Sequence, residues 1–194
     1  MDSYIDIRFM EDDEIPIYFI RNKTFTKLHK ALHDQKQTVI GVSFPNYKVK
    51  LGDTIRLHGN KPALDTLQQS NWLGGLAGYC DVGEILPVPE NIEGYRTVSR
   101  KQPTMTLKKM QVRIAYQKQQ GILKTAEDIK AYERQYKEKM YGSQSLDNPY
   151  LELKSSSNGQ LYRVFIEMGE IQDKSVSGDF NYFGLSKIAT VPWF

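Results

Sequence analysis

The chain has 194 residues, of which 40% are hydrophobic and 11% are aromatic. This composition excludes a mainly disordered chain, and the length allows one large domain or two small ones. The single cysteine, Cys80, excludes an intrachain disulfide and a cysteine-rich zinc site. The N-terminal residues Met1-Asp2-Ser3-Tyr4 are acidic rather than basic, and the chain lacks an apolar run of the ~20 residues that a membrane span needs. We therefore expect a cytoplasmic protein that contacts no membrane.

Residues 1–94 are predicted to form one α+β domain. The first strand alternates apolar and polar residues, and the helix after it carries an apolar stripe that would face a sheet. Asn60 is the expected N-cap of a second helix, which glycines close from Gly74 onward. The order β-α-β-β-α-β predicts a ferredoxin-like fold. The predicted strands are 4–9, 39–44, 54–58 and 82–88, and the first helix is 16–34.

Residues 95–194 are predicted to form a linker, a basic helix and a β-rich C-terminal domain. The linker, 91–103, shows little regular pattern. Asn158-Gly159 between two apolar-rich runs predicts a β-hairpin, because both turn positions need a positive φ. Thr125 begins a second, mixed-charge helix with a capping-box-like pattern. The remaining predicted elements are the basic helix 106–119, the hairpin strands 150–155 and 161–168, a polar loop 142–149, and a last strand near 180–185.

The positive charge of the chain is concentrated in residues 96–125. This segment holds eight lysines and arginines and no acidic residue, whereas the rest of the chain holds 18 basic and 23 acidic residues. Such segregation is typical of a protein with a polyanion partner, and it favours nucleic acid over an ordinary solvated helix face.

Three histidines, His29, His33 and His58, are the candidates for proton transfer near neutral pH. An RNase needs little more, because the 2′-hydroxyl beside each phosphate is a built-in nucleophile that the protein must align and deprotonate. His29 lies beside the apolar stripe of the first helix, where a packed helix residue is the ordinary alternative. His29 and His33 are also spaced i and i+4, as in some zinc sites, but no third ligand is evident. The sequence gives no functional argument for His58.

The turn 155–160 carries three serines, which are either ordinary turn residues or hydroxyls that hold a ribose or phosphate. Tyr162, just past the turn, either packs across strands or provides a platform for a base.

Several short strings, in order and at matching spacing, resemble the repeat-processing endoribonucleases of type I-F CRISPR systems. No single string is specific, but together they span nearly the whole chain. They are Met1-Asp2, Ile7-Arg8, residues 27–32, 41–45, Tyr95-Arg96, Val98-Ser99-Arg100, Gln102, 155–160, Arg163, Phe165, 184–187 and 191–194.

This resemblance implies roles for individual residues. His29 matches the catalytic histidine, which acts as general base, and Ser155 matches the serine that pins the ribose. Ser157 matches a phosphate contact, Arg100 and Gln102 match linker residues that read purine edges, and Tyr162 matches an aromatic that stacks on the terminal base pair. The basic helix, with Lys108, Lys109 and Arg113, would lie along the major groove of the RNA stem.

The resemblance also implies an activity. Members of this family cut repeat RNA at the 3′ base of its stem, without metal or other cofactor, and leave a 2′,3′-cyclic phosphate. They then hold the product within a surveillance complex of several subunits. Here Phe183, with Tyr182 beside it, stands where the family has a tyrosine that positions the histidine. A phenylalanine packs against imidazole without hydrogen-bonding to it, so a non-cleaving subunit that binds the crRNA hairpin is the alternative function.

Overall fold

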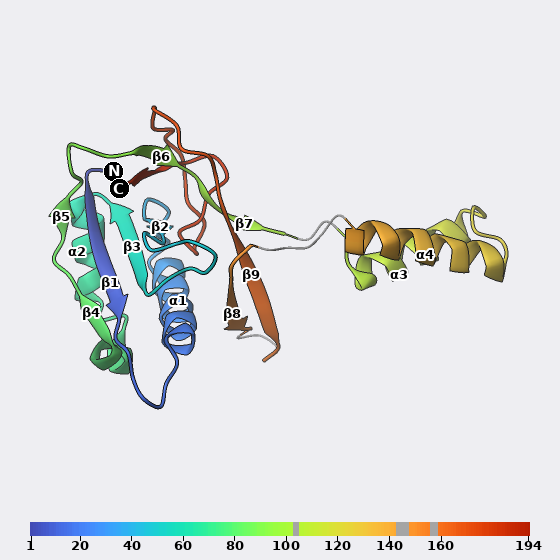
Figure 1. Ribbon diagram of the computed structural model, residues 1–194, viewed down its shortest axis with the longest axis horizontal. Helices are drawn as coiled ribbons and strands as arrows, with labels where there is room; N and C mark the ends of the chain where they lie inside the picture. The colour runs from blue at the N-terminus through green and yellow to red at the C-terminus, as the bar shows by residue number, and fades with distance from the viewer. Residues whose placement is uncertain (103–104, 143–147, 156–158) are drawn as a thin grey trace. The chain divides into compact units, whose positions relative to one another are not determined.

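The computed structural model describes residues 1–102, 105–142, 148–155 and 159–194. The residues form two compact units, one of residues 1–101 with 148–194 and one of residues 102–147. Figure 1 shows the elements of both. This grouping differs from the predicted division after residue 94, because the late strands pack into the core of the first unit. Within the described residues, no helix is long and apolar enough to cross a membrane.

The first unit is built on a ferredoxin-like sheet, as predicted. Its strand order is β2-β3-β1-β4, and each neighbouring pair is antiparallel. This is the order that the split β-α-β pattern produces. A short strand also pairs with β1, and a 3-10 helix precedes β4. The elements are β1 (Ser3–Phe9), α1 (Ile17–Asp34), β2 (Gly41–Ser43), β3 (Thr54–Gly59), α2 (Lys61–Gln69), η1 (Gly74–Tyr79), β4 (Cys80–Val82) and β5 (Leu86–Pro87).

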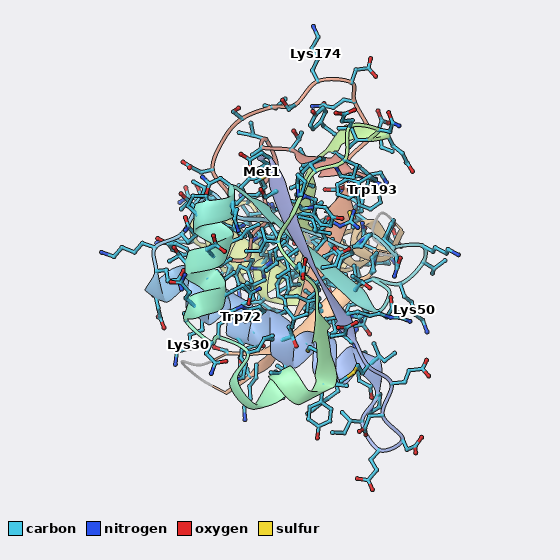
Figure 2. All side chains as sticks on the ribbon, turned by 90° about the vertical axis from the view of Figure 1, so that its left-hand side faces the viewer. Met1, Lys30, Lys50, Trp72, Lys174 and Trp193 are labelled. Carbon is cyan, nitrogen blue, oxygen red and sulfur yellow. The ribbon has the colours of Figure 1, made fainter. Side chains whose placement is uncertain are left out.

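The helices form where the sequence pattern predicts them, except that α2 ends at Gln69, and the glycines expected to close it lie in η1 instead. Phe25, Leu28 and Leu32 of α1 are fully buried, which matches the apolar stripe of the sequence. The side chain of Asn60 accepts a hydrogen bond from the amide of Ala63 at 2.8 Å and so caps α2. Figure 2 looks toward α2 and places Trp72 after the end of this helix, away from Trp193.

The predicted linker 91–103 is wrong, because it contains two strands. β6 (Gly94–Arg96) pairs with β10 (Val191–Trp193), and β7 (Val98–Lys101) pairs with β9 (Leu161–Met168). Both pairs join segments that are distant in the sequence, so no local pattern marks them. The predicted hairpin is confirmed: β8 (Tyr150–Lys154) pairs with β9 in antiparallel register. β8 in turn packs beside α1, which brings this second sheet against the first helix.

The second unit consists of two helices. α3 (Leu107–Gln119) is capped by Thr106, whose hydroxyl accepts a hydrogen bond from Lys109 N. α4 (Ala126–Gly142) begins after Thr125, and Thr125 and Asp128 bond to each other's amides as the capping box predicts. The two helices share a small apolar cluster made of Met110, Ile114, Tyr136 and Met140.

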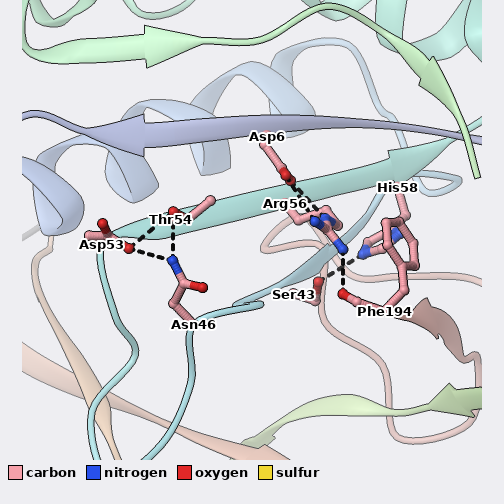
Figure 3. A network of polar contacts seen from close by, with 8 residues as sticks. All are labelled: Asp6, Ser43, Asn46, Asp53, Thr54, Arg56, His58 and Phe194. Atoms are coloured by element: carbon pink, nitrogen blue, oxygen red, sulfur yellow. Dashed lines mark hydrogen bonds and ion pairs between the residues drawn. The ribbon is translucent and has the colours of Figure 1, made fainter. Parts of the chain in front are cut away.

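The face of the ferredoxin sheet opposite the helices is occupied at β3 by the end of the chain. The Arg56 guanidinium donates to both carboxylate oxygens of Asp6, at 2.7 and 2.9 Å, and to the main-chain oxygen of Phe194 at 2.7 Å. It also lies over the rings of Phe194 and Tyr4, at 3.9 and 4.8 Å from their centroids. Figure 3 shows this network. Here, therefore, the sheet surface is covered by protein and is closed to a ligand.

His58 lies in the same network and is fully buried. Its Nε2 is 2.8 Å from the Ser43 hydroxyl, and its Nδ1 has no hydrogen-bond partner among the described residues. Burial, with the positive charge of Arg56 as a smaller cause, lowers the pKa of His58 from 6.5 to about 3. A buried Ser–His pair with so weak a base, out of reach of substrate, is a structural contact.

We predict that His58 makes the stability of the protein fall in acid. Between pH 6.5 and about 3 the unfolded chain binds a proton on this imidazole and the folded chain does not. The free energy of unfolding should therefore decrease as the pH falls below 6.5, by up to about 1.4 kcal/mol per pH unit from this group. Urea unfolding at a series of pH values, with wild type and His58→Gln, measures the slope. Equal slopes in the two proteins would contradict the prediction.

Candidate active site

His29 is half-buried on α1, one turn after Phe25, at the edge of the core. The ring of Phe183 stacks on its imidazole, with centroids 3.8 Å apart and planes 4° from parallel. Phe183 is itself stacked on Phe25 at 6.0 Å, and Phe25 on Phe44 at 6.3 Å. The imidazole is thus the last member of a series of rings that begins in the buried core. This packing fixes the plane of the ring.

A hydrogen bond fixes which nitrogen of His29 carries the proton. Nδ1 is 2.9 Å from the carbonyl oxygen of Tyr182. A carbonyl oxygen only accepts, so Nδ1 must be the donor. In the neutral imidazole Nε2 is then left with its lone pair, which is the form a general base requires. The hydrogen bond that Phe183 cannot make is therefore made by the neighbouring main chain.

The turn that carries Tyr182 and Phe183 is tightly held. The side-chain oxygen of Asn181 accepts hydrogen bonds from the amides of Phe183 and Leu185, at 2.8 and 3.3 Å. Gly184 has a φ of +69°, and its carbonyl accepts a hydrogen bond from Val42 of β2 at 2.8 Å. The strand predicted near 180–185 is therefore wrong. Asn181 and Gly184 form a turn instead, which residues of these types favour.

Ser155 lies directly after β8, the strand that packs beside α1. Its amide donates to the carbonyl of Gln160 at 2.8 Å, and its carbonyl accepts from Gly159 at 2.9 Å. The strand that precedes Ser155 thus packs against the helix that carries His29. Ser157 lies outside the described residues.

Arg100 and Tyr162 lie on the same face of the β7-β9-β8 sheet. Arg100 on β7 is opposite Ile166, and Tyr162 on β9 is opposite Leu153. The Arg100 guanidinium lies 5.9 Å from the centroid of the Tyr162 ring, and Tyr162 is half-buried against the core. Gln102 is exposed and follows the end of β7. These residues and Ser155 all belong to, or adjoin, one small sheet.

The predicted basic helix is α3, and its lysines and arginine are exposed. Lys108, Lys109 and Arg113 all lie outside the apolar contact with α4, although the Arg113 guanidinium lies 5.7 Å from the ring centroid of Tyr136. The exposed side of α3 also carries Val112 and Tyr116, which are 64% and 61% exposed. The helix therefore presents a face that is cationic and partly apolar.

Comparison with known proteins identifies the family. Residues 4–194 match the family model described as CRISPR-associated protein (Cas_Csy4). The chain belongs to the Csy4 family of CRISPR-associated endonucleases. It is 38% identical over 194 residues to the CRISPR-associated endonuclease Cas6/Csy4 of Escherichia coli (strain UTI89 / UPEC). It is 35% identical over 197 residues to the protein of the same name from Pseudomonas aeruginosa (strain UCBPP-PA14). Both matches cover all of this chain and all of the relative, so the family resemblance seen in the sequence is confirmed.

Among solved structures, this Csy4 chain matches one of the CRISPR endoribonuclease Cse3 bound to a 19-nucleotide RNA. The match covers 99% of this chain and 100% of the other, with 15% identity and a TM-score of 0.36. That score is too low to support an inference about the site.

The structure of this Csy4 chain also shows how His33 relates to the site. His33 is exposed on α1, with its ring centroid 6.4 Å from that of His29, and its Nδ1 lies 3.4 Å from Asp34. The described residues contain no group of three or more His, Cys, Asp or Glu side chains placed to bind a metal ion. The third ligand that the zinc interpretation lacked in the sequence is thus not found in the described residues.

The sequence pointed to Phe183 but not to the other residues that hold His29 in place. Tyr182 acts through its carbonyl, which no side-chain pattern reveals. Asn181 and Gly184 did carry a signal, because asparagine and glycine three residues apart are typical of a turn. The network of Arg56 on the sheet face gave no signal in the sequence either, since its partners Asp6 and Phe194 are distant in the sequence.

We predict that Gly184→Ala disturbs the imidazole of His29. An added Cβ would lie 2.3 Å from Val42 Cγ2, and the residue would keep a positive φ that alanine disfavours. The turn must then shift and weaken the hydrogen bond to Nδ1. Imidazole ¹⁵N–¹H spectra at neutral pH should show Nδ1 protonated in wild type and a mixture of tautomers in the variant. Gly75→Ala is the matched control, because nothing lies within 4 Å of its added Cβ. Identical spectra for G184A and wild type would contradict the prediction.

Proposed function

We propose that the protein is a metal-independent endoribonuclease that binds the stem-loop of CRISPR repeat RNA and cleaves it at the 3′ base of the stem. The observation that carries the proposal is the hydrogen bond from His29 Nδ1 to the carbonyl of Tyr182. It leaves Nε2 of a half-exposed imidazole as the base. The names of the full-length relatives, which are CRISPR-associated endonucleases, support the same activity.

The reaction follows from these groups. Nε2 of His29 takes the proton of the 2′-hydroxyl, and the 2′ oxygen attacks the adjacent phosphorus as the bond to the 5′ oxygen breaks. The products are a 2′,3′-cyclic phosphate and a free 5′-hydroxyl. The Ser155 hydroxyl, directly after β8, holds the ribose so that its 2′ oxygen stays in line. Ser157 binds a nearby phosphate.

The remaining residues hold the RNA. Arg100 and Gln102 contact purine edges in the major groove near the base of the stem, where Arg pairs best with guanine. Tyr162, whose ring centroid lies 5.9 Å from the Arg100 guanidinium, stacks on the terminal base pair. Lys108, Lys109 and Arg113 of α3 neutralise phosphates along the stem. These many contacts keep the product bound, so each enzyme molecule turns over about once. The protein then stays with its guide RNA and the other subunits of a surveillance complex.

The contacts of His29 argue against the alternative function, a non-cleaving subunit that only binds the hairpin. That alternative arose because Phe183 cannot hydrogen-bond to His29. The Tyr182 carbonyl makes this bond and Phe183 supplies the stacking contact. An oriented base therefore survives the replacement of tyrosine by phenylalanine, which favours the enzyme.

Cleavage assays on type I-F repeat stem-loop RNAs test the proposal. We expect cleavage to persist in EDTA, to stop when the 2′-hydroxyl upstream of the cut is replaced by hydrogen, and to fall about 10²–10⁴-fold in His29→Ala, because general-base catalysis contributes that much. RNA affinity should stay near the wild-type value in each case. Loss of cleavage in EDTA would favour a metal-dependent hydrolase, and tight binding of intact RNA by wild type would favour the non-cleaving subunit.

Ser155→Ala separates alignment from binding in the same assay. We expect a larger loss in the cleavage rate than in affinity, because the hydroxyl aligns the nucleophile. Lys23→Gln, an exposed change on the first half of α1, is the matched control and should cleave like wild type. Equal losses of rate and affinity in S155A would refute the alignment role.

A further inference from the structure

The reaction proposed above needs a second proton transfer that His29 does not provide. As the 2′ oxygen attacks, the 5′ oxygen leaves as an alkoxide unless a proton reaches it, and a positioned acid speeds such a step. His29 accepts a proton in this step and so cannot donate one at the same time. A group that carries a proton near neutral pH is required a few ångströms away.

His33 has the position and the chemistry for this task. It lies one helical turn beyond His29 on α1, and the ring centroids are 6.4 Å apart. The 2′ and 5′ oxygens lie on opposite sides of the phosphorus. The base must therefore contact one oxygen and the acid the other, each through a hydrogen bond of about 2.8 Å. Two imidazoles at the observed spacing are suited to flank the pair.

Tyr182 contacts both histidines. Its carbonyl receives the hydrogen bond from His29 Nδ1, and its ring meets the His33 ring edge-on at 5.1 Å and 75°. The groups described as facing His33 are Asp34 and His29 on α1 and Tyr182 on the turn. Asp34 Oδ1 lies 3.4 Å from Nδ1 of His33, so a proton on this nitrogen would be directed at the carboxylate and would leave Nε2 to face outward. In the imidazolium form of His33, Nε2 carries the second proton, and no hydrogen-bond partner of Nε2 is found among the described residues.

We propose that His33 is the general acid of the cleavage reaction, a proposal that rests on the function proposed above. The proton of the 2′-hydroxyl passes to Nε2 of His29 as the bond from the 2′ oxygen to phosphorus forms. The bond from phosphorus to the 5′ oxygen breaks, and that oxygen receives the proton of Nε2 of His33. The enzyme is left with His29 protonated and His33 neutral, and exchange with water restores both.

A sulfur leaving group tests the role of His33. In a stem-loop RNA with a 5′-bridging phosphorothiolate at the cut, the leaving thiolate needs no proton, because thiols are far more acidic than alcohols. We expect His33→Gln to slow single-turnover cleavage of the ordinary RNA by about 10²-fold, and to cleave the sulfur-containing RNA at close to the wild-type rate. His29→Ala should be slow on both RNAs, since it lacks the base.

Two further variants separate proton transfer from packing. His33→Phe keeps a ring against Tyr182 but has no proton to give, so it should be as slow as His33→Gln on the ordinary RNA. Lys23→Gln should match wild type on both RNAs. If H33F cleaves like wild type, or if the sulfur substitution fails to rescue H33Q, His33 is not the acid even though H29A is inactive. If wild type fails to cleave, or H29A cleaves normally, the proposed function fails and this proposal with it.

Discussion

The orientation of the His29 imidazole depends on one hydrogen bond, from its Nδ1 to the carbonyl of Tyr182. An imidazole on a helix surface rotates and changes tautomer freely, and such a residue is a poor base for any fixed nucleophile. Here the ring is stacked on Phe183 and its proton is placed on one nitrogen. The turn that carries Tyr182 and Phe183 is itself hydrogen-bonded to Val42, on the edge strand of the ferredoxin sheet. The geometry of a single nitrogen is therefore set by the fold as a whole.

The arrangement explains why the C-terminal segment belongs structurally with the first domain. The segment after residue 180 contributes the turn against His29, the strand β10 that pairs with β6, and Phe194, which binds Arg56 on the sheet face. Covering that face leaves the ferredoxin sheet unavailable as an RNA platform at β3. In the proposed function, the second sheet, with Arg100 and Tyr162, and the exposed lysines and arginine of α3 contact the RNA instead.

Much of the fold was predictable from the sequence, and the two missed strands in the linker have a common cause. The helices, their caps, the ferredoxin order and the 150–168 hairpin all follow from local periodicity or turn residues, and the structure confirms them. The strands β6 and β7 were taken for a linker because each is short and pairs with a strand at least sixty residues away, and strand propensity depends on such tertiary context. For the site, His29 and Phe183 were found by type and resemblance. The Tyr182 carbonyl could not be, since a main-chain oxygen leaves no mark in the side-chain pattern.

The most direct measurement is the structure of the protein bound to a repeat stem-loop that lacks the 2′-hydroxyl at the cut. We predict that His29 Nε2 lies about 3–4 Å from the C2′ atom of the nucleotide before the scissile phosphate. Nδ1 should still be hydrogen-bonded to the Tyr182 carbonyl, and the Ser155 hydroxyl should contact the same ribose. An RNA seated with its cleavable linkage away from α1, or an imidazole turned so that Nδ1 faces the ribose, would contradict it.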